Sequence, residues 1–242
     1  MTVFFQRFTP MFSPILFFIK YFNKVLKYVV SYSFISFLSS ATAGSYEDFF
    51  KAIRNDEVKV VSNLLARGFD PNTVSLNAEP AILLCLVHDS LKTFELIAKH
   101  PKTQLNVRNA HSETALMLVS LRGHTHLAKL LVSRQADINH PGWTPLHYAA
   151  TGGHVEIIQL LLDESAYIDA ESPNGSTPLM MAARYGNAKS VQLLLNEGAD
   201  FEVKNQLGLT ALDFAKEGKR PEAIKLLETA MKLANSDSNR TK

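Results

Sequence analysis

The fold is decided by the stretch Gly142-Trp143-Thr144-Pro145-Leu146-His147-Tyr148-Ala149-Ala150-Thr151-Gly152-Gly153-His154. A second copy of it reads Gly175-Ser176-Thr177-Pro178-Leu179-Met180-Met181-Ala182-Ala183-Arg184-Tyr185-Gly186. Weaker copies begin at Thr114 and Thr210, so the starting threonines of the four copies lie 30, 33 and 33 residues apart. A repeated period in this range indicates an array of stacked structural repeats.

Each copy contains the signals of a short first helix and then a second helix. The starting threonine suits a helix N-cap, because its hydroxyl can accept a hydrogen bond from a free backbone N–H. Pro145 and Pro178 follow at the first helical position, where no N–H is needed. Gly123, Gly153 and Gly186 are expected to end the first helix. Apolar residues then recur through the second helix.

This pattern resembles the ankyrin repeat family, on residues 144–149, 177–179 and 193–200, and the resemblance covers roughly residues 46–233. It implies an all-α solenoid of about six stacked repeats, each with two antiparallel helices and a projecting β-hairpin finger. It also implies that His147 bonds local backbone between repeats. The residues that define the repeats are Thr114, Thr144, Pro145, His147, Thr177, Pro178, Thr210, Gly123, Gly153 and Gly186.

The repeat spacing predicts a repeat domain at residues 44–234, followed by a disordered polar tail at 235–242. The step from the third to the fourth repeat is three residues short, which predicts a truncated finger at 139–143. The last repeat is expected to be a cap that buries less, so that Leu227→Ala would destabilise less than Leu161→Ala. The expected repeats are at about 44–75, 77–108, 109–139, 140–172, 173–205 and 206–234.

Residues 1–43 indicate a secretory signal peptide. Three lysines precede the apolar stretch 28–38, which is too short for a comfortable membrane span, and an Ala-x-Ala site ends at Ala43. We therefore expect cleavage after Ala43 and a periplasmic or secreted protein of bacterial type. Two alternatives stay open: a translation start at Met11, or retention of residues 11–38 as a membrane anchor for a tethered scaffold.

Charge and composition exclude some classes of partner. The chain has 25 basic and 23 acidic residues, but residues 1–46 hold four basic residues and no acid, so the remainder carries a net charge of −2. Lys and Arg do not cluster with interleaved aromatic residues, which argues against nucleic-acid binding. The single cysteine, Cys85, excludes an intramolecular disulfide, and we interpret it as a buried apolar residue.

The sequence contains no motif of catalysis or cofactor binding: GxSxG, a phosphate-binding glycine loop and HExxH are all missing. We therefore predict a protein that is not an enzyme and holds no cofactor or metal. His124 and His126 are close enough to bind a transition metal weakly, since imidazole suits such ions. The alternative from this pair is a metal-handling or enzymatic accessory protein with a histidine-containing groove.

The favoured interpretation is a monomeric, non-catalytic scaffold that binds a protein partner through its fingers and its concave inner-helix face. Membrane contact is expected only if the N-terminal segment is retained. Trp143 is the strongest anchor candidate, because an exposed tryptophan on a finger is a typical hot-spot residue. Met180 and Met181 are expected to lie partly in the core. The candidate partner contacts are Trp143, His140, Leu121, Arg122, Arg184 and Tyr185.

Overall fold

The computed structural model describes residues 44–240. The predicted signal peptide, its cleavage point after Ala43 and the alternative anchor at 11–38 therefore lie outside the described residues. The chain divides into two compact units, Met1–Phe49 and Phe50–Lys242. The described residues of the first unit, 44–49, are helical. Within the described range, no helix is both long enough and apolar enough to cross a membrane.

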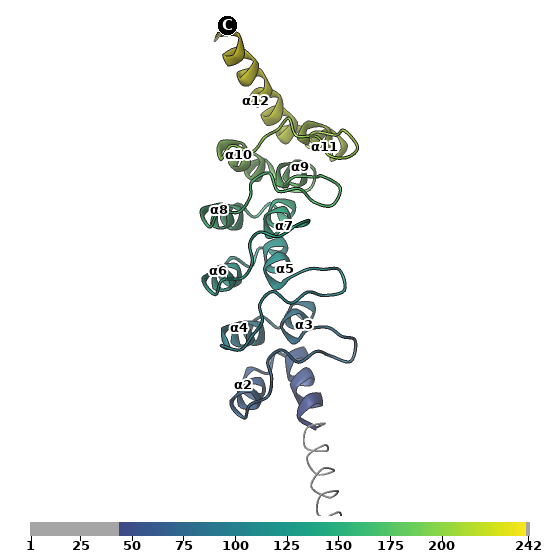
Figure 1. The fold of residues 1–242 in the computed structure, drawn as a ribbon, viewed down its shortest axis with the longest axis vertical. Helices are drawn as coiled ribbons and strands as arrows, with labels where there is room; N and C mark the ends of the chain where they lie inside the picture. The colour runs from purple at the N-terminus through teal and green to yellow at the C-terminus, as the bar shows by residue number, and fades with distance from the viewer. Residues whose placement is uncertain (1–43, 241–242) are drawn as a thin grey trace, which may run out of the picture. The chain divides into compact units, whose positions relative to one another are not determined.

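The second unit is a stack of helix pairs. Its inner helices α3, α5, α7, α9 and α11 form one row, and the outer helices α2, α4, α6, α8 and α10 form a second row beside it (Figure 1). The predicted all-α repeat stack is thereby confirmed. In chain order, after helical residues 50–54, the helices are α2 (Val58–Ala66), α3 (Ala81–Val87), α4 (Leu91–Lys99), α5 (Ala115–Arg122), α6 (Thr125–Ser133), α7 (Pro145–Gly152), α8 (Val155–Asp163), α9 (Pro178–Arg184), α10 (Ala188–Asn196), α11 (Ala211–Glu217) and α12 (Pro221–Arg240).

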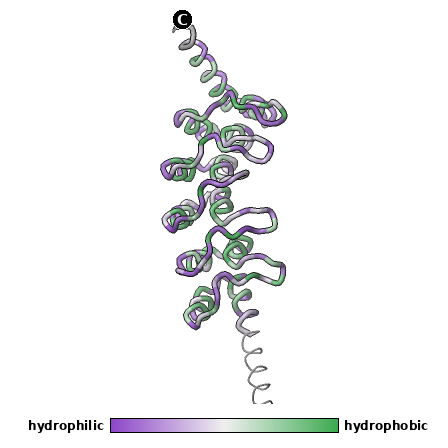
Figure 2. The backbone as a smooth tube through the Cα atoms, viewed as in Figure 1, coloured by the Kyte–Doolittle hydropathy of each residue, from purple (hydrophilic) through white to green (hydrophobic). Residues whose placement is uncertain are grey.

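The helices of both rows carry hydrophobic and hydrophilic segments, as expected of helices that bury one face (Figure 2). In α8, for example, Ile157, Ile158 and Leu161 are fully buried. Met180 is buried as predicted, whereas Met181 is only partly buried. Each inner helix packs on the next, α5 on α7, α7 on α9 and α9 on α11, so the core continues from repeat to repeat.

A threonine occupies the N-cap position of four inner helices, α5, α7, α9 and α11, whereas Pro80 precedes α3. The hydroxyls of Thr114, Thr177 and Thr210 each accept a hydrogen bond from the backbone N–H three residues later, at 3.4 Å in every case. These three N-caps are confirmed. Thr144 differs: its hydroxyl makes no cap bond in α7 and lies 2.9 Å from His147 Nδ1 instead. Pro145 and Pro178 are the first residues of α7 and α9, also as predicted.

The predicted glycines have two different functions. Gly123 and Gly153 follow α5 and α7 in the left-handed conformation, with φ of 75° and 69°, which confirms them as helix ends. Gly186 differs, because α9 ends at Arg184 with Tyr185 as its C-cap. A Cβ atom on Gly186 would lie 2.5 Å from the carbonyl oxygen of Ala150. The expectation for Gly186 is therefore corrected: it permits close approach of α9 to α7 rather than a left-handed turn.

A side chain from each repeat caps the end of the preceding inner helix. Helix termini leave carbonyl oxygens without intrahelical partners. Here these oxygens accept bonds from a variety of donors one repeat further along the chain. The bonds are Ser90 Oγ to Ile53 O (2.5 Å), Arg122 Nη1 to Leu86 O, His154 Nε2 to Leu121 O (3.0 Å), Asn187 Nδ2 to Gly153 O (2.8 Å) and Arg220 Nε to Arg184 O (3.0 Å).

The fingers are tight loops rather than pairs of long strands. Within the described residues, β-type pairing occurs at the isolated bridge between Val74 and Pro80. The finger before α7, at residues 139–143, projects less than the others (Figure 1), as the three missing residues predict. The other four loops are closed by backbone bonds from Ser75 N to Glu79 O, Asn109 N to Glu113 O, Ser172 N to Ser176 O and Asn205 N to Leu209 O.

The last helix extends further than the sequence suggests. Helix α12 continues to Arg240, past Asn235, where the polar tail is expected to begin. It packs on α10 and α11 through residues such as Leu227, which is 0% exposed, as is Leu161. Burial therefore corrects the expectation that Leu227 in the capping repeat contributes less than Leu161 in the centre.

Leu161→Ala and Leu227→Ala should each lower the free energy of unfolding by about 2–5 kcal/mol, because each deletes a fully buried leucine side chain. The matched control is Leu233→Ala in α12, where the leucine is 61% exposed; it should change stability by less than about 0.5 kcal/mol. Urea unfolding of the three variants measures this. A loss for Leu227→Ala as small as that for Leu233→Ala would contradict the placement of α12.

Candidate functional site

A groove of about 580 Å³ lies along the inner helices α7, α9 and α11 and the two fingers between them. Three of the predicted partner contacts, Trp143, Arg184 and Tyr185, line it. Trp143 directly precedes the N-cap of α7, while Arg184 and Tyr185 end α9. The stack thus brings together residues that are about 40 positions apart in sequence.

Trp143 is partly buried rather than exposed, which corrects one expectation. Its ring meets the His147 ring edge-on, with centroids 5.2 Å apart and planes at 76°. Trp143 also lines the groove. Tyr185 is more open, at 49% exposed. A partner contact at either residue stays a prediction.

Leu121, Arg122 and His140 do not line the groove. Leu121 and Arg122 end α5 and are exposed, but the Arg122 guanidinium is engaged by the carbonyl oxygen of Leu86. His140 is partly buried in the short finger, with Nδ1 3.1 Å from the carbonyl oxygen of Pro141. The structure therefore separates the six candidates into three that share a site and three that do not.

The Arg184 guanidinium lies between aromatic and acidic groups. Its central carbon lies 5.3 Å from the Tyr185 ring centroid and 5.9 Å from that of Phe214. One of its nitrogens pairs with the Glu217 carboxylate. Arg220 holds the end of α9 by donating to the carbonyl oxygens of Arg184 and Tyr185. Cation–π contacts and the ion pair together position this charge.

Several groove residues were not predicted from the sequence. Phe214 comes from α11, and Asn174, Asn205 and Leu207 come from the fingers. A signal did exist for two others. The residue directly before each starting threonine is Trp143, Ser176 or Leu209 in the last three copies, and all three line the groove. Aligning the repeats on their threonines would have indicated this shared position.

His147 is fully buried and links two repeats, as the resemblance implies. Its Nδ1 accepts from the backbone N–H of Thr144 at 3.2 Å, and its Nε2 lies 2.9 Å from the carbonyl oxygen of Ser176. This pattern places the proton of the neutral ring on Nε2. Burial lowers the pKa of His147 to about 4, although the bonds to carbonyl oxygens act in the opposite direction. The ring is therefore neutral at pH 7.

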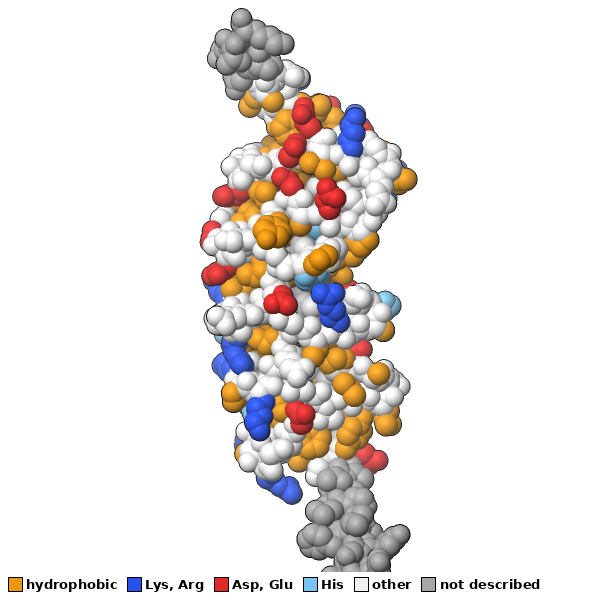
Figure 3. Space-filling view, viewed as in Figure 1, with side chains coloured by type: hydrophobic (Ala, Val, Ile, Leu, Met, Phe, Trp, Pro, Cys, Tyr) orange, Lys and Arg blue, Asp and Glu red, His pale blue; other side chains and the backbone are white. Residues whose placement is uncertain are grey.

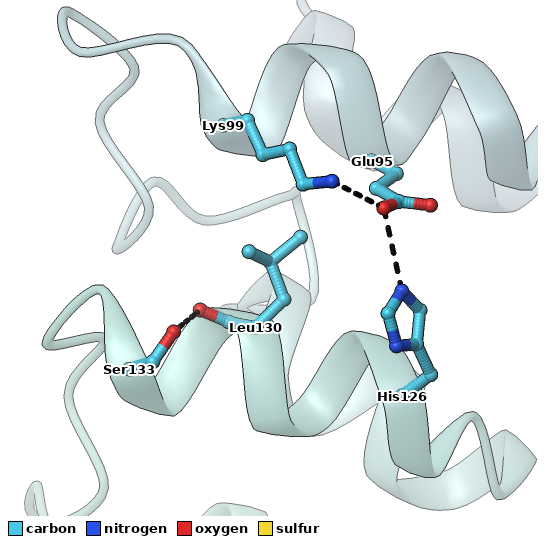
Figure 4. Close-up of polar contacts among 5 residues, drawn as sticks. All are labelled: Glu95, Lys99, His126, Leu130 and Ser133. Atoms are coloured by element: carbon cyan, nitrogen blue, oxygen red, sulfur yellow. Dashed lines mark hydrogen bonds and ion pairs between the residues drawn. The ribbon is translucent and has the colours of Figure 1, made fainter.

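The His124 and His126 pair is not part of a metal-ligand cluster in the described residues, where no group of three His, Cys, Asp or Glu side chains could hold an ion. His126 points instead at Glu95 of α4, with Nε2 3.3 Å from Oε1 (Figure 4). Lys99 also bonds that carboxylate, at 2.5 Å, and together with His126 it lowers the pKa of Glu95. Cys85 is fully buried, which raises the pKa of its thiol.

Comparisons with known proteins agree with the geometry. A family model described as "Ankyrin repeats (3 copies)" matches residues 82–172 and 165–239, well over half of the chain. Ankyrin repeat and SAM domain-containing protein 6 of Mus musculus is 31% identical over 109 residues, which are 43% of this chain and 12% of that protein. Protein fem-1 homolog A-like of Mus musculus is 38% identical over 79 residues, 31% of this chain and 12% of that protein. Protein phosphatase 1 regulatory subunit 12A of Mus musculus is 42% identical over 62 residues, 24% of this chain and 6% of that protein. The chain thus matches only a small part of the length of these relatives.

Stability should fall as the pH drops from about 6.5 towards 4, because of His147. The unfolded chain takes up a proton near pH 6.5, whereas the buried ring resists it until about pH 4. The contribution of neutral His147 to the free energy of unfolding is therefore fully present above pH 6.5. About 3 kcal/mol of it is lost by pH 4. His147→Met should remove this dependence.

Methionine is the matched replacement, because Met117 and Met180 hold the same position in α5 and α9. Their sulfurs accept the N-cap N–H at 3.3 and 3.4 Å. Free energies of unfolding measured from pH 7.5 to 4.5 for the native protein and His147→Met provide the test. Parallel curves for the two proteins would show that His147 does not titrate as described.

Proposed function

The chain belongs to the ankyrin repeat family, and from this premise we propose that it is a non-catalytic scaffold that binds a protein partner in the groove along α7, α9 and α11. The relatives named above carry their matching repeats in different settings: one is named for a SAM domain and another as a phosphatase regulatory subunit. What they share with this chain is the repeat. The shared repeat supports a role as a protein-interaction module, but it does not identify the partner.

The observation that carries the proposal is the pair of aromatic residues with accessible surface, Trp143 and Tyr185, at one open groove that the buried Phe214 also lines. Aromatic residues and arginine are the usual hot spots of protein interfaces, and Arg184 lies among them. Leu207, at the tip of the neighbouring finger, is 79% exposed. Because the helices beneath are packed, the groove exists before binding, and little conformational entropy is lost when a partner enters.

The groove chemistry supports binding rather than catalysis. Its charged residues, Arg184 and Glu217, neutralise each other. His147 lies next to Trp143, but both of its ring nitrogens are already bonded to the protein. A general base needs a free nitrogen within reach of a substrate proton, and His147 offers none in this arrangement.

Photo-crosslinking tests the proposed function. Tyr185 is replaced by p-benzoylphenylalanine in the native host, and Tyr167 is replaced in the matched control, since it is 69% exposed but lies outside the groove. We expect discrete crosslinked proteins from position 185 and none of the same proteins from position 167. Adding Leu207→Asp should reduce the products at least fivefold, because the groove wall becomes charged. Identical products from both positions, or none from position 185, would refute the proposal.

Export is a second proposal, supported by the signal-like pattern of residues 1–43 alone. Mass spectrometry of the protein purified from its native host should find an N-terminus at Gly44. Recovery of Met1 or Met11 as the N-terminus of the mature protein would contradict cleavage. In the membrane fraction, such an intact N-terminus would favour the tethered scaffold.

A further inference from the structure

A notch of about 300 Å³ lies on the outer row of helices, between the C-terminal halves of α2 and α4. The notch is open because Ser62 of α2 is small. The next four outer helices carry longer residues at the same position, Glu95, Lys129, Gln159 and Gln192. The notch shares no residue with the groove, and its lining consists of Ser62, Leu65, Ala66, Leu96, Lys99 and His100.

The segments that form the notch are basic. Residues 58–69 and 90–108 hold six basic residues and one carboxylate. The carboxylate, Glu95, is already bonded by Lys99 and His126 (Figure 4). All six basic side chains are exposed, namely Lys59, Arg67, Lys92, Lys99, Lys102 and Arg108. A protein surface that covers the notch is therefore favoured if it carries negative charge.

Tyr167 is an exposed aromatic residue on the same row. It follows the end of α8 by four residues and is 69% exposed. Its backbone N–H bonds Asn139 Oδ1 at 2.9 Å, as the N–H of Asp137 bonds Asn106 Oδ1 one repeat earlier. The loop therefore uses the backbone of this residue and does not require an aromatic ring. Three other repeats have aspartate at the same position, Asp70, Asp137 and Asp200.

The chain around Tyr167 is acidic. Residues 155–183 contain no lysine or arginine and five acidic residues, Glu156, Asp163, Glu164, Asp169 and Glu171. Along the outer-helix edge of the face drawn in Figure 3, basic side chains gather towards the N-terminal end of the stack and acidic ones towards the C-terminal end. The exposed tyrosine and the notch thus lie in surroundings of opposite charge.

The positions of the two features fit a two-fold axis beside α6. The notch lies before α6 along the outer row, and Tyr167 follows α8 on the other side of α6. In a two-fold pair, each contact between two different residues occurs twice. The end of α6 then faces its own copy. Its charges are compatible with this, because Arg134 and Asp137 have opposite signs and Arg134 already donates to the carbonyl oxygen of His100.

We propose that the protein forms a symmetric dimer in which Tyr167 of each copy enters the notch of the other. The ring packs on Leu65 and Leu96, and the carboxylates beside it face the basic rim. A buried tyrosine removes about 150–250 Å² from water, so two such contacts form an interface of the small, transient class. The groove stays open in this dimer, since neither Tyr167 nor the notch lines it. A dimer of this kind departs from the monomer expected from the sequence.

Sedimentation velocity over a range of protein concentrations measures the dimer, using the protein purified from its native host. We expect a reversible monomer–dimer equilibrium at about 0.05 M salt. The association should weaken at least fivefold at about 0.5 M salt, because salt screens the charges around the notch.

Two substitutions remove the contact from either side. Tyr167→Asp should weaken the dimer at least tenfold and still fold, because three repeats have aspartate at this position. Ser62→Gln should have the same effect, because it fills the notch with the residue that α8 and α10 carry there. Leu207→Asp is the control, since it changes an exposed residue of the groove. It should leave the dimer unchanged, and urea unfolding verifies that each variant folds.

Mixing the two variants tests the symmetry. The Tyr167→Asp variant keeps an open notch and the Ser62→Gln variant keeps its tyrosine, so a heterodimer retains one of the two contacts. We expect heterodimers in the mixture at concentrations where each variant alone is monomeric. In the native host, crosslinking from position 167 should correspondingly yield the protein itself.

A monomer at every concentration would overturn the inference. A dimer that Tyr167→Asp or Ser62→Gln leaves intact would also overturn it, as would equal weakening by Leu207→Asp. Loss of the dimer in both variants without recovery on mixing would refute the exchange of tyrosines. Crosslinking from position 185 tests the groove separately, so each of these results leaves the proposed function standing.

Discussion

The structure depends on one recurring hydrogen bond, in which a side chain of each repeat caps the carbonyl end of the preceding inner helix. The bond joins neighbours and gives a partner to a carbonyl oxygen that the helix end would otherwise leave without one. It also requires the backbones to approach closely. A Cβ on Gly152 would lie 2.6 Å from Leu121 O, and one on Gly218 would lie 2.6 Å from Arg184 O. Small residues at these points, rather than large apolar ones, therefore determine how tightly the repeats stack.

The groove is a consequence of that stacking. Because the helices are fixed side by side, residues one repeat apart meet across their surface, as Arg184 meets Phe214 and Glu217. The fingers supply the second wall, and their first residues hold the loops closed by accepting backbone N–H groups.

The sequence predicts the architecture well and the site only in part. Threonine caps and proline positions reflect local backbone requirements, so they can be read within one repeat, and the period follows from comparing the copies. The cross-repeat caps were not predictable, because serine, arginine, histidine and asparagine all serve the same purpose. Arg122 illustrates this. From the sequence it is indistinguishable from a free surface charge, but its guanidinium donates a hydrogen bond to the carbonyl oxygen of Leu86. The groove was found through Trp143, Arg184 and Tyr185, whereas the residues that α11 and the fingers supply to it were not predicted.

The capping bonds give the stack a direction. Each repeat contributes one donor towards the repeat before it and leaves one carbonyl end for the repeat after it. An array built this way resembles a polymer with two unlike ends. A gene duplication that inserts a whole repeat brings a donor and an acceptor together, so the number of pairs stays balanced whatever the donor's identity. Such an array can lengthen or shorten in evolution by whole repeats while its seams stay satisfied.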